Sequence, residues 1–461
     1  MTHGEEVARA QLAARAAERP SRLTAMLAAR TPGELRALVQ APDSPAPGEP
    51  ARLRRAYAAE LGLAAADLDF RELYPGLDRG IYACSHSMGM PSVAGPAAVE
   101  EHLAQLAHHG IGVWDEGAWV ELMDRYRAAV AELVGGDLAR GDVTWFPNAS
   151  EALCAVLEGV ESGTLVYSAG HFTTGHYVHH QWAQNTGGRL LEVPLDADGS
   201  VPTERMVAAL TPDVRVLSIS HALFESGWVQ DLPALAAALR ERCPDALLLV
   251  DAYQTCGSIP IDAAALGDNV AIVAAGHKQL RSGTGAGFLY LPRRWYSQLT
   301  PRRTGWWNHR APFAFEKGAV VRAEDGTRFR SGTPTVMAQA MLLGELAAFA
   351  TSAGGSIGEA VVRARRVTSG LVQTLLDHCA RQGLGVRGDW PAERRAAFVC
   401  VEVDHGPRIN EALGHQGIRV DFRPSDGERG WLRVSGNAAG FAYEMEAVIT
   451  AILHEGGGRS R

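Results

Sequence analysis

Short apolar runs alternate with longer amphipathic stretches between about residues 80 and 292. Runs of this kind are typical of strands buried on both faces, and their alternation with helical segments predicts a mostly parallel α/β sheet. Because ligands bind beyond the carboxyl ends of such strands, we expect the chemistry to lie directly after them. The predicted strands contain TLVYSAG, LLEVPL, VRVLSIS, ALLLVDAY, VAIVAAG and GAGFLYL.

The pattern changes on either side of this region. At the N-terminus, EEVARAQLAARAAERPSRLTAMLAA has helical spacing, and the Pro-rich APDSPAPGEP separates it from a second helical piece. After about residue 354, a long helical segment leads to the strand-like AAFVCVEV, IRVDFR and WLRVS and then to a final helix. We therefore predict an N-terminal helical arm at 1–79, a large α/β domain at 80–350 and a small α+β domain at 351–461.

Composition narrows the class of function. The chain has 52 acidic against 44 basic residues and a net charge of −8, which argues against a nucleic acid or an anionic membrane as partner. Apolar runs such as DALLLVDAY fall short of the ~20 residues that span a bilayer. We expect a cytoplasmic protein that acts on a small molecule. The six cysteines are scattered without a CxxC pair, which favours reduced thiols over disulfides or a zinc site.

The segment AAGHKQLRSGTGAGFLYL holds the central candidate residue, Lys278, between an apolar strand and a Gly-rich turn. Partial burial and cationic neighbours lower the pKa of a lysine amine and make it nucleophilic, so that it can form a Schiff base. A lysine near a loop is more often a solvated charge. The neighbouring motifs must therefore decide between the two interpretations.

Three further motifs supply groups suited to pyridoxal 5′-phosphate (PLP). Asp251 closes the strand in ALLLVDAYQTCG, where a carboxylate would keep a pyridinium nitrogen protonated, and Gln254 would hydrogen-bond the phenolate oxygen. Ser150, in FPNASEALC, begins a helix whose free N–H groups suit a phosphate. Phe172, in SAGHFTTGHY, would stack on the pyridine ring. Taken singly, these motifs have simpler interpretations: a turn cap, an ordinary helix start and a core aromatic.

In this order, the segments resemble the class V aminotransferase-like branch of the fold-type I PLP enzymes, and within it kynureninase. The resemblance runs from about residue 80 to 453, with GWWNHRAPFAFE, RFRSGTP and VDFRP before WLRVS as its specific motifs. It implies that the domain at 80–350 binds PLP and that the enzyme is a homodimer with shared active sites. By this resemblance, Lys278 forms the Schiff base, Asp251 pairs with the pyridinium nitrogen and Phe172 stacks on the ring. The phosphate is bound by Ala149, Ser150 and His277, and the phosphate in the neighbouring subunit is reached by Trp306 and Thr333. Arg433 binds the α-carboxylate of the substrate.

Three positions differ from the kynureninase pattern. His277 stands where a tyrosine precedes the lysine, Gln254 replaces a histidine, and Gly175 stands where an aspartate is expected. The lost phenol removes a proton donor for cleavage at a side-chain carbonyl. We therefore expect an enzyme that acts at Cα or Cβ of a bulky L-amino acid. It is similar to PLP enzymes of lincosamide antibiotic pathways, which process a cysteine S-conjugate by β-elimination or by decarboxylation coupled to oxidative deamination.

Other functions stay open at this point. A kynureninase or an aminotransferase would use the same lysine. A catalytically silent binding subunit would need neither Lys278 nor Arg433. If Arg433 formed a surface salt bridge, it would have no role in substrate binding. A cysteine desulfurase is disfavoured because Cys400 lies in an apolar run, where a thiol is inert. The histidines of HFTTGHYVHHQ lack nearby carboxylates, so no metal site is predicted. By position alone, the pocket candidates are Trp114, Trp119, His86, Phe224, Tyr177 and Tyr253.

Overall fold

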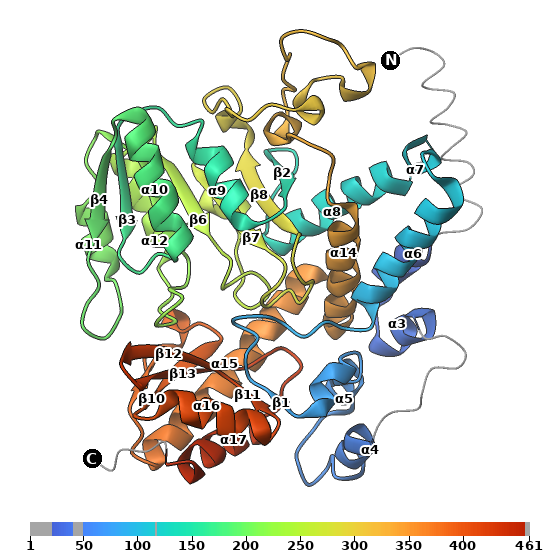
Figure 1. Cartoon of the computed structure of the whole chain (residues 1–461), viewed down its shortest axis with the longest axis vertical. Helices are drawn as coiled ribbons and strands as arrows, with labels where there is room; N and C mark the ends of the chain where they lie inside the picture. The colour runs from blue at the N-terminus through green and yellow to red at the C-terminus, as the bar shows by residue number, and fades with distance from the viewer. Residues whose placement is uncertain (1–20, 40–48, 116–117, 457–461) are drawn as a thin grey trace.

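A seven-stranded sheet forms the centre of the chain in the computed structural model, which describes residues 21–39, 49–115 and 118–456 (Figure 1). The strand order is β2-β8-β7-β6-β5-β3-β4, and only β8 runs antiparallel to its neighbours. The predicted fold class, a mostly parallel α/β sheet, is confirmed. The strands are β2 (Gly141–Phe146), β3 (Thr164–Ser168), β4 (Arg189–Val193), β5 (Val214–Ser220), β6 (Leu247–Asp251), β7 (Val270–Ala275) and β8 (Gly287–Pro292).

Both faces of this sheet are covered, which explains why its strands are apolar throughout. Leu248 and Val250 of β6 belong to a core that includes side chains of α12, whereas Leu247 and Leu249 belong to a second core with α9 and α10. Successive residues of a strand point to opposite faces, so an unbroken apolar run serves both cores. The connecting helices are α9 (Ala149–Leu157), α10 (Thr173–Thr186), α11 (Thr203–Ala208), α12 (Leu232–Arg242) and α13 (Ala263–Leu266).

A smaller antiparallel sheet, in the order β12-β13-β10-β9, lies in the C-terminal part beside three helices (Figure 1). Its elements are α15 (Ile357–Arg381), β9 (Val386–Arg387), β10 (Phe398–Val403), α16 (Gly406–His415), β12 (Asp421–Asp426), β13 (Arg429–Ser435) and α17 (Ala442–His454). The short strand β1 (Ile81–Tyr82) pairs with β11 (Ile418–Arg419) of this part. The domain boundaries after residues 79 and 350 stay predictions, and residues 81–82 lie against the C-terminal part.

The N-terminal helices join the two parts. Arg71 is buried and forms a salt bridge of 2.7 Å with Glu444 of α17, and Asp67 pairs with Arg363 of α15. Residues 1–20 of the predicted arm and most of the Pro-rich break lie outside the described residues. The helices are α2 (Arg22–Ala28), α3 (Pro32–Val39), α4 (Glu49–Ala56) and α5 (Ala65–Arg71).

The long helix α14 (Val336–Ala350) packs on α6 (Ala94–His109), α8 (Ala118–Leu133) and α2. The short helix α7 (Gly112–Asp115) contacts α6 and α8. Among the described residues, the stretch Val336–Ala353 is long and apolar enough to cross a membrane, yet 72% of it is buried inside the protein. Such burial is typical of a core helix. Short 3-10 turns are η1 (Pro75–Arg79), η2 (Arg293–Trp295), η3 (Trp306–Asn308), η4 (Pro312–Ala314), η5 (Gly326–Phe329), η6 (Thr351–Ala353) and η7 (Ala392–Arg394).

Candidate active site

The carboxyl ends of β3, β6 and β7 bring three of the predicted residues together. Asp251 is the last residue of β6, Lys278 comes three residues after the end of β7, and Phe172 caps the helix that follows β3. The Lys278 Nζ lies 5.8 Å from the centre of the Phe172 ring and 4.7 Å from that of Tyr253. Parallel strands end at one edge of the sheet, which explains why residues so far apart in sequence meet here.

A tight turn holds Lys278 in place. The N–H of Gly89 donates to the His277 carbonyl at 2.7 Å, and a Cβ on Gly89 would lie 2.1 Å from the Lys278 carbonyl oxygen, so only glycine fits there. At the end of the turn, Arg281 has a φ of 63°. Burial lowers the pKa of the Lys278 amine to about 8, against an opposing effect of Asp251. The amine is therefore far more nucleophilic near neutral pH than an exposed lysine.

The Asp251 carboxylate is buried and accepts a hydrogen bond of 3.0 Å from the Tyr253 N–H. Burial raises its pKa. Three residues on, the side-chain oxygen Oε1 of Gln254 is buried and has no hydrogen-bond partner within the described residues. Both groups are acceptors at the same strand end, and an unsatisfied buried acceptor indicates a place for a ligand.

The N-terminus of α9 offers the predicted anion site. Asn148 caps this helix by accepting from the Glu151 N–H at 2.9 Å, and the helix itself begins at Ala149 and Ser150. The Ser150 hydroxyl lies 3.5 Å from that of Thr174, at the start of α10. Two helix N-termini thus meet beside each other, and their partial positive charges favour a phosphate.

Arg433, on β13, lies in the small sheet and is almost fully buried. Its guanidinium donates to the Phe224 carbonyl at 2.7 Å and forms a salt bridge with Asp421 of β12. The Phe224 ring in turn packs edge-on against Phe172 at 5.1 Å. Arg433 therefore reaches the same site from the other part of the chain. It is already paired with the carboxylate of Asp421, which is not among the predicted site residues.

Asp421 has further partners. It accepts from the Ser87 hydroxyl at 2.8 Å, and the His86 Nε2 lies 3.5 Å from it. Burial alone would raise the pKa of Asp421. The contacts with His86 and Arg433 outweigh burial, so the pKa of Asp421 lies well below its usual range. Asp421 stands directly opposite Arg433 in the β12–β13 register. In the sequence, only the alternation of side-chain directions along the two predicted strands indicates that Asp421 and Arg433 could face each other.

Trp306 and Thr333 lie together, with a hydrogen bond of 3.3 Å between them, in an aromatic cluster apart from the residues around Lys278. The cluster consists of Trp114, Trp119, Trp306, Trp307, Phe313 and Phe315. Phe313 and Phe315 are 50% and 71% exposed. The predicted contact of Trp306 and Thr333 with a neighbouring subunit stays a prediction, and the exposed aromatic faces are compatible with it.

Of the four histidines in the segment HFTTGHYVHHQ, His171 and His179 are buried, His176 is half-buried 3.7 Å from Glu192, and His180 is exposed. His179 hydrogen-bonds the Ser218 hydroxyl at 2.9 Å, and His171 lies 3.2 Å from that of Ser220. A Cβ on Gly175 would collide with the His171 ring, which accounts for the missing aspartate at this position. Within the described residues, no three His, Cys, Asp or Glu side chains gather as they would around a metal ion.

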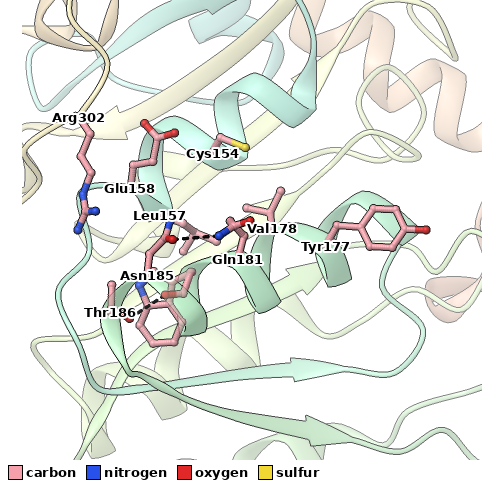
Figure 2. A pocket seen from close by; sticks show the side chains of 10 residues that line it. Cys154, Leu157, Glu158, Tyr177, Val178, Gln181, Asn185, Thr186 and Arg302 are labelled. Atoms are coloured by element: carbon pink, nitrogen blue, oxygen red, sulfur yellow. Dashed lines mark hydrogen bonds between the residues drawn. The ribbon is translucent and has the colours of Figure 1, made fainter.

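A separate groove of about 280 Å³ lies between the C-terminal half of α9 and the side of α10 that runs from Tyr177 to Thr186 (Figure 2). Cys154, Tyr177, Gln181 and Arg302 are among its lining residues, and Figure 2 shows the first three coming from the two helices. Tyr177, a pocket candidate by position, is 70% exposed here. None of the residues predicted to bind PLP lines this groove.

The residues around Lys278 fit PLP. They combine an amine of lowered pKa, a buried carboxylate at the next strand end and a helix N-terminus, and the Phe172 side chain leaves 42% of its surface exposed for stacking. All six cysteines are free, and burial raises the pKa of the Cys400 thiol to about 12. These groups match the reactive aldehyde, the pyridine ring and the phosphate of this cofactor.

Comparison with known proteins agrees with this chemistry. Kynureninase of Burkholderia pseudomallei strain K96243 is 26% identical over 359 residues, which cover 74% of this chain and 82% of that protein. The uncharacterized aminotransferase YcbU of Bacillus subtilis strain 168 is 27% identical over 269 residues, which cover 58% of this chain and 68% of that one.

Solved structures share the fold at lower identity. The cystine C-S lyase C-DES, in complex with its product cysteine persulfide, superposes with a TM-score of 0.72 at 20% identity and covers 84% of this chain and 100% of that chain. The cysteine desulfurase of Thermococcus onnurineus NA1 has a TM-score of 0.71 at 18% identity, with coverages of 84% and 97%. The family model for aminotransferase class V matches residues 99–422. The chain therefore belongs to the class V aminotransferase family, and its cofactor is PLP.

Proposed function

We propose that the chain is a PLP-dependent lyase that cleaves the Cβ–S bond of a bulky L-cysteine S-conjugate. The balanced reaction consumes the S-conjugate and water and releases a thiol, pyruvate and ammonium. The observation that supports it most is the position of Lys278 between the rings of Phe172 and Tyr253, with its pKa lowered to about 8. A neutral amine held there is a base able to take the Cα proton.

The other residues have roles that follow from their chemistry. When bound, PLP withdraws electrons from Cα of the amino acid and so weakens the bonds of that atom. Asp251 would hold a proton on the ring nitrogen, Phe172 would stack on the ring, and the α9 N-terminus would bind the phosphate. Arg433 would bind the α-carboxylate through charge-assisted hydrogen bonds. With Cα thus oriented, Lys278 removes its proton and the sulfur leaves from Cβ as the thiol.

Two observations separate this proposal from the functions of relatives. Cys400 is buried in β10 and donates to the Glu225 carbonyl, so no mobile thiolate is available on that strand for desulfurase chemistry. His277 replaces the tyrosine of the kynureninase pattern, which removes a phenol donor from the position before Lys278. An S-conjugate needs no proton donor at a carbonyl, because the sulfur is the leaving group.

Decarboxylation coupled to oxidative deamination is the second candidate, and the pairing of Arg433 with Asp421 favours it. The anionic Asp421 repels a substrate carboxylate and so weakens its binding to Arg433. Loss of that carboxylate as CO₂ removes the repulsion. In this reaction the amino acid, O₂ and water give an aldehyde, CO₂, ammonia and hydrogen peroxide, so that O₂ accepts the two electrons.

We also propose that the enzyme works as a cytoplasmic homodimer in antibiotic biosynthesis of the lincosamide type. The exposed aromatic side chains of the cluster around Trp306 support the homodimer, and the acidic net charge of −8 supports the cytoplasmic location. The resemblance to the lincosamide-pathway enzymes supports the role in antibiotic biosynthesis.

The test is a product analysis of the PLP-loaded protein with a bulky cysteine S-conjugate and, separately, with L-kynurenine. Thiol and pyruvate in equal amounts are the expected result, and aldehyde with CO₂ would select the second candidate. Anthranilate and alanine from kynurenine at a rate comparable to kynureninases would overturn both. Lys278→Ala should abolish product formation, whereas Lys317→Ala, at the exposed second lysine of the chain, should not.

A further inference from the structure

Tyr253 and His277 form a hydrogen-bonded pair beside Lys278, across the ends of two adjacent strands. The Tyr253 hydroxyl makes its closest contact with Nδ1 of His277 and lies 3.2 Å from Nε2. The two ring centres are 4.7 Å apart, at an angle of 66°. Tyr253 follows β6 and His277 follows β7, so the pair links the turn of Asp251 to the turn of Lys278.

Burial decides which partner donates. It raises the pKa of Tyr253, so the phenol keeps its proton. Burial and the charge of Lys278 lower the pKa of His277, so the imidazole stays neutral and retains one acceptor nitrogen. The phenol therefore donates to the nearer nitrogen, Nδ1, and the imidazole proton lies on Nε2.

Through Tyr253, the pair borders the same core cluster as the helix that begins at the predicted anion site. The Tyr253 ring packs on the core cluster that includes Ala149, the first residue of α9. Both Tyr253 and His277 are half-buried, unlike the buried Asp251. The charged groups facing the pair are the Lys278 amine and the Asp251 carboxylate.

We propose that Tyr253 is a positioning residue that fixes the tautomer and orientation of His277, so that the His277 Nε2–H donates to the phosphate of PLP. The proposal rests on the proposed place of the phosphate at α9 and His277, and it does not depend on the substrate. The role of Tyr253 toward the phosphate is exerted through His277, and its ring, which lies 4.7 Å from the Lys278 Nζ, is retained in a phenylalanine variant.

The first experiment compares the affinities of the apoenzyme for PLP and for pyridoxal, which lacks the phosphate. Tyr253→Phe should weaken PLP binding roughly 2- to 10-fold, the factor of one ordinary hydrogen bond, and leave pyridoxal binding unchanged. In a His277→Ala background, Tyr253→Phe should have no further effect on PLP. Tyr177→Phe, an exposed tyrosine on α10, is the matched control. Equal weakening of both ligands, no weakening, or a full effect in the His277→Ala background would overturn the proposal.

A second readout addresses the tautomer directly. Nitrogen-15 NMR of histidine-labelled holoenzyme should show the Nε2–H form for His277 and a mixture of forms in Tyr253→Phe. Unchanged His277 signals in the variant would overturn the proposal even if PLP binding were weaker. Since neither experiment uses an amino-acid substrate, a wrong assignment of the reaction would leave both results unchanged.

Discussion

Asp421 and Arg433 lie directly opposite each other on β12 and β13 and are joined by a salt bridge. The Ser87 hydroxyl and the Phe224 carbonyl accept further hydrogen bonds from the same guanidinium, at 3.1 and 2.7 Å. Its Nε is buried and has no partner within the described part of the chain. Arg433 is thus held rigidly while one donor stays unused, and an orphaned buried donor favours an anionic ligand.

Replacing Arg433 tests its role in substrate binding. Arg433→Gln should raise the KM for the amino-acid substrate about 10- to 100-fold, since charge-assisted hydrogen bonds are lost. Cofactor absorbance should persist, because the large sheet and its strand ends are untouched. Arg423→Gln is the matched control, since Arg423 also pairs with Asp421, at 3.2 Å, but is 51% exposed. Equal effects of the two substitutions on KM would contradict the assignment.

The half-exposed ring of Phe172 should contribute to cofactor affinity through stacking. Phe172→Ala should weaken PLP binding roughly 2- to 10-fold, the usual effect of one aromatic pair, without lowering the melting temperature of the apoenzyme. Equilibrium titration with PLP measures the first quantity and thermal unfolding the second. Tyr177→Ala, on the same helix, should change neither, and unaltered PLP affinity in Phe172→Ala would exclude stacking.

Shared active sites can be tested by mixing two inactive variants. Trp306→Ala should damage the neighbouring subunit's site, and Lys278→Ala its own. In a mixed dimer, one site then keeps both residues, so equal mixing and re-association should restore about one quarter of the wild-type activity. If Trp306 served its own subunit, or if the chain were a monomer, mixing would restore nothing.

The buried carboxyl group of Glu345 should make stability depend on pH. Glu345, on α14, accepts hydrogen bonds from the Ser92 N–H and hydroxyl at 2.9 and 3.0 Å, and burial raises its pKa to about 8. The folded pKa exceeds the unfolded value of 4.5, so the stabilisation is complete below the unfolded value and is lost as pH rises through about 8.

Glu345→Gln should remove this contribution. Compared with the wild type, its melting temperature should fall less steeply between about pH 5 and 8. Glu359→Gln, at an exposed position of α15, should keep the wild-type slope. The same slope in all three proteins would show that Glu345 titrates in the folded state as it does in the unfolded chain.

The strands of the large sheet were predictable because burial on both faces requires unbroken apolar runs. TLVYS became β3 and VAIVAA became β7. The proximity of Asp251 and Lys278 was also predictable, because each residue follows or ends a parallel strand and parallel strands end at the same edge of the sheet. The core helix α14 was not recognised, because Gln339 and Glu345 interrupt its apolar sequence although both are buried.

Contacts that depend on register and turn geometry could not be predicted in this way. The strand β1 pairs with β11 through two residues each, too few to leave a pattern. Asp421 reaches Arg433 only because β12 and β13 pair in one register. The Tyr253 and His277 contact arises from two turns after separate strands, so neither motif alone indicates it.

The covalent attachment of PLP to Lys278 is the central claim, and the chain permits a simple test because it has only two lysines, Lys278 and Lys317. Borohydride reduction of the holoenzyme, followed by proteolysis and mass spectrometry, fixes the cofactor to the amine that holds it. We predict the phosphopyridoxyl group on the peptide that contains Lys278 and none on the peptide with the exposed Lys317. A label on Lys317 or on the N-terminal amine, with Lys278 unmodified, would contradict the account.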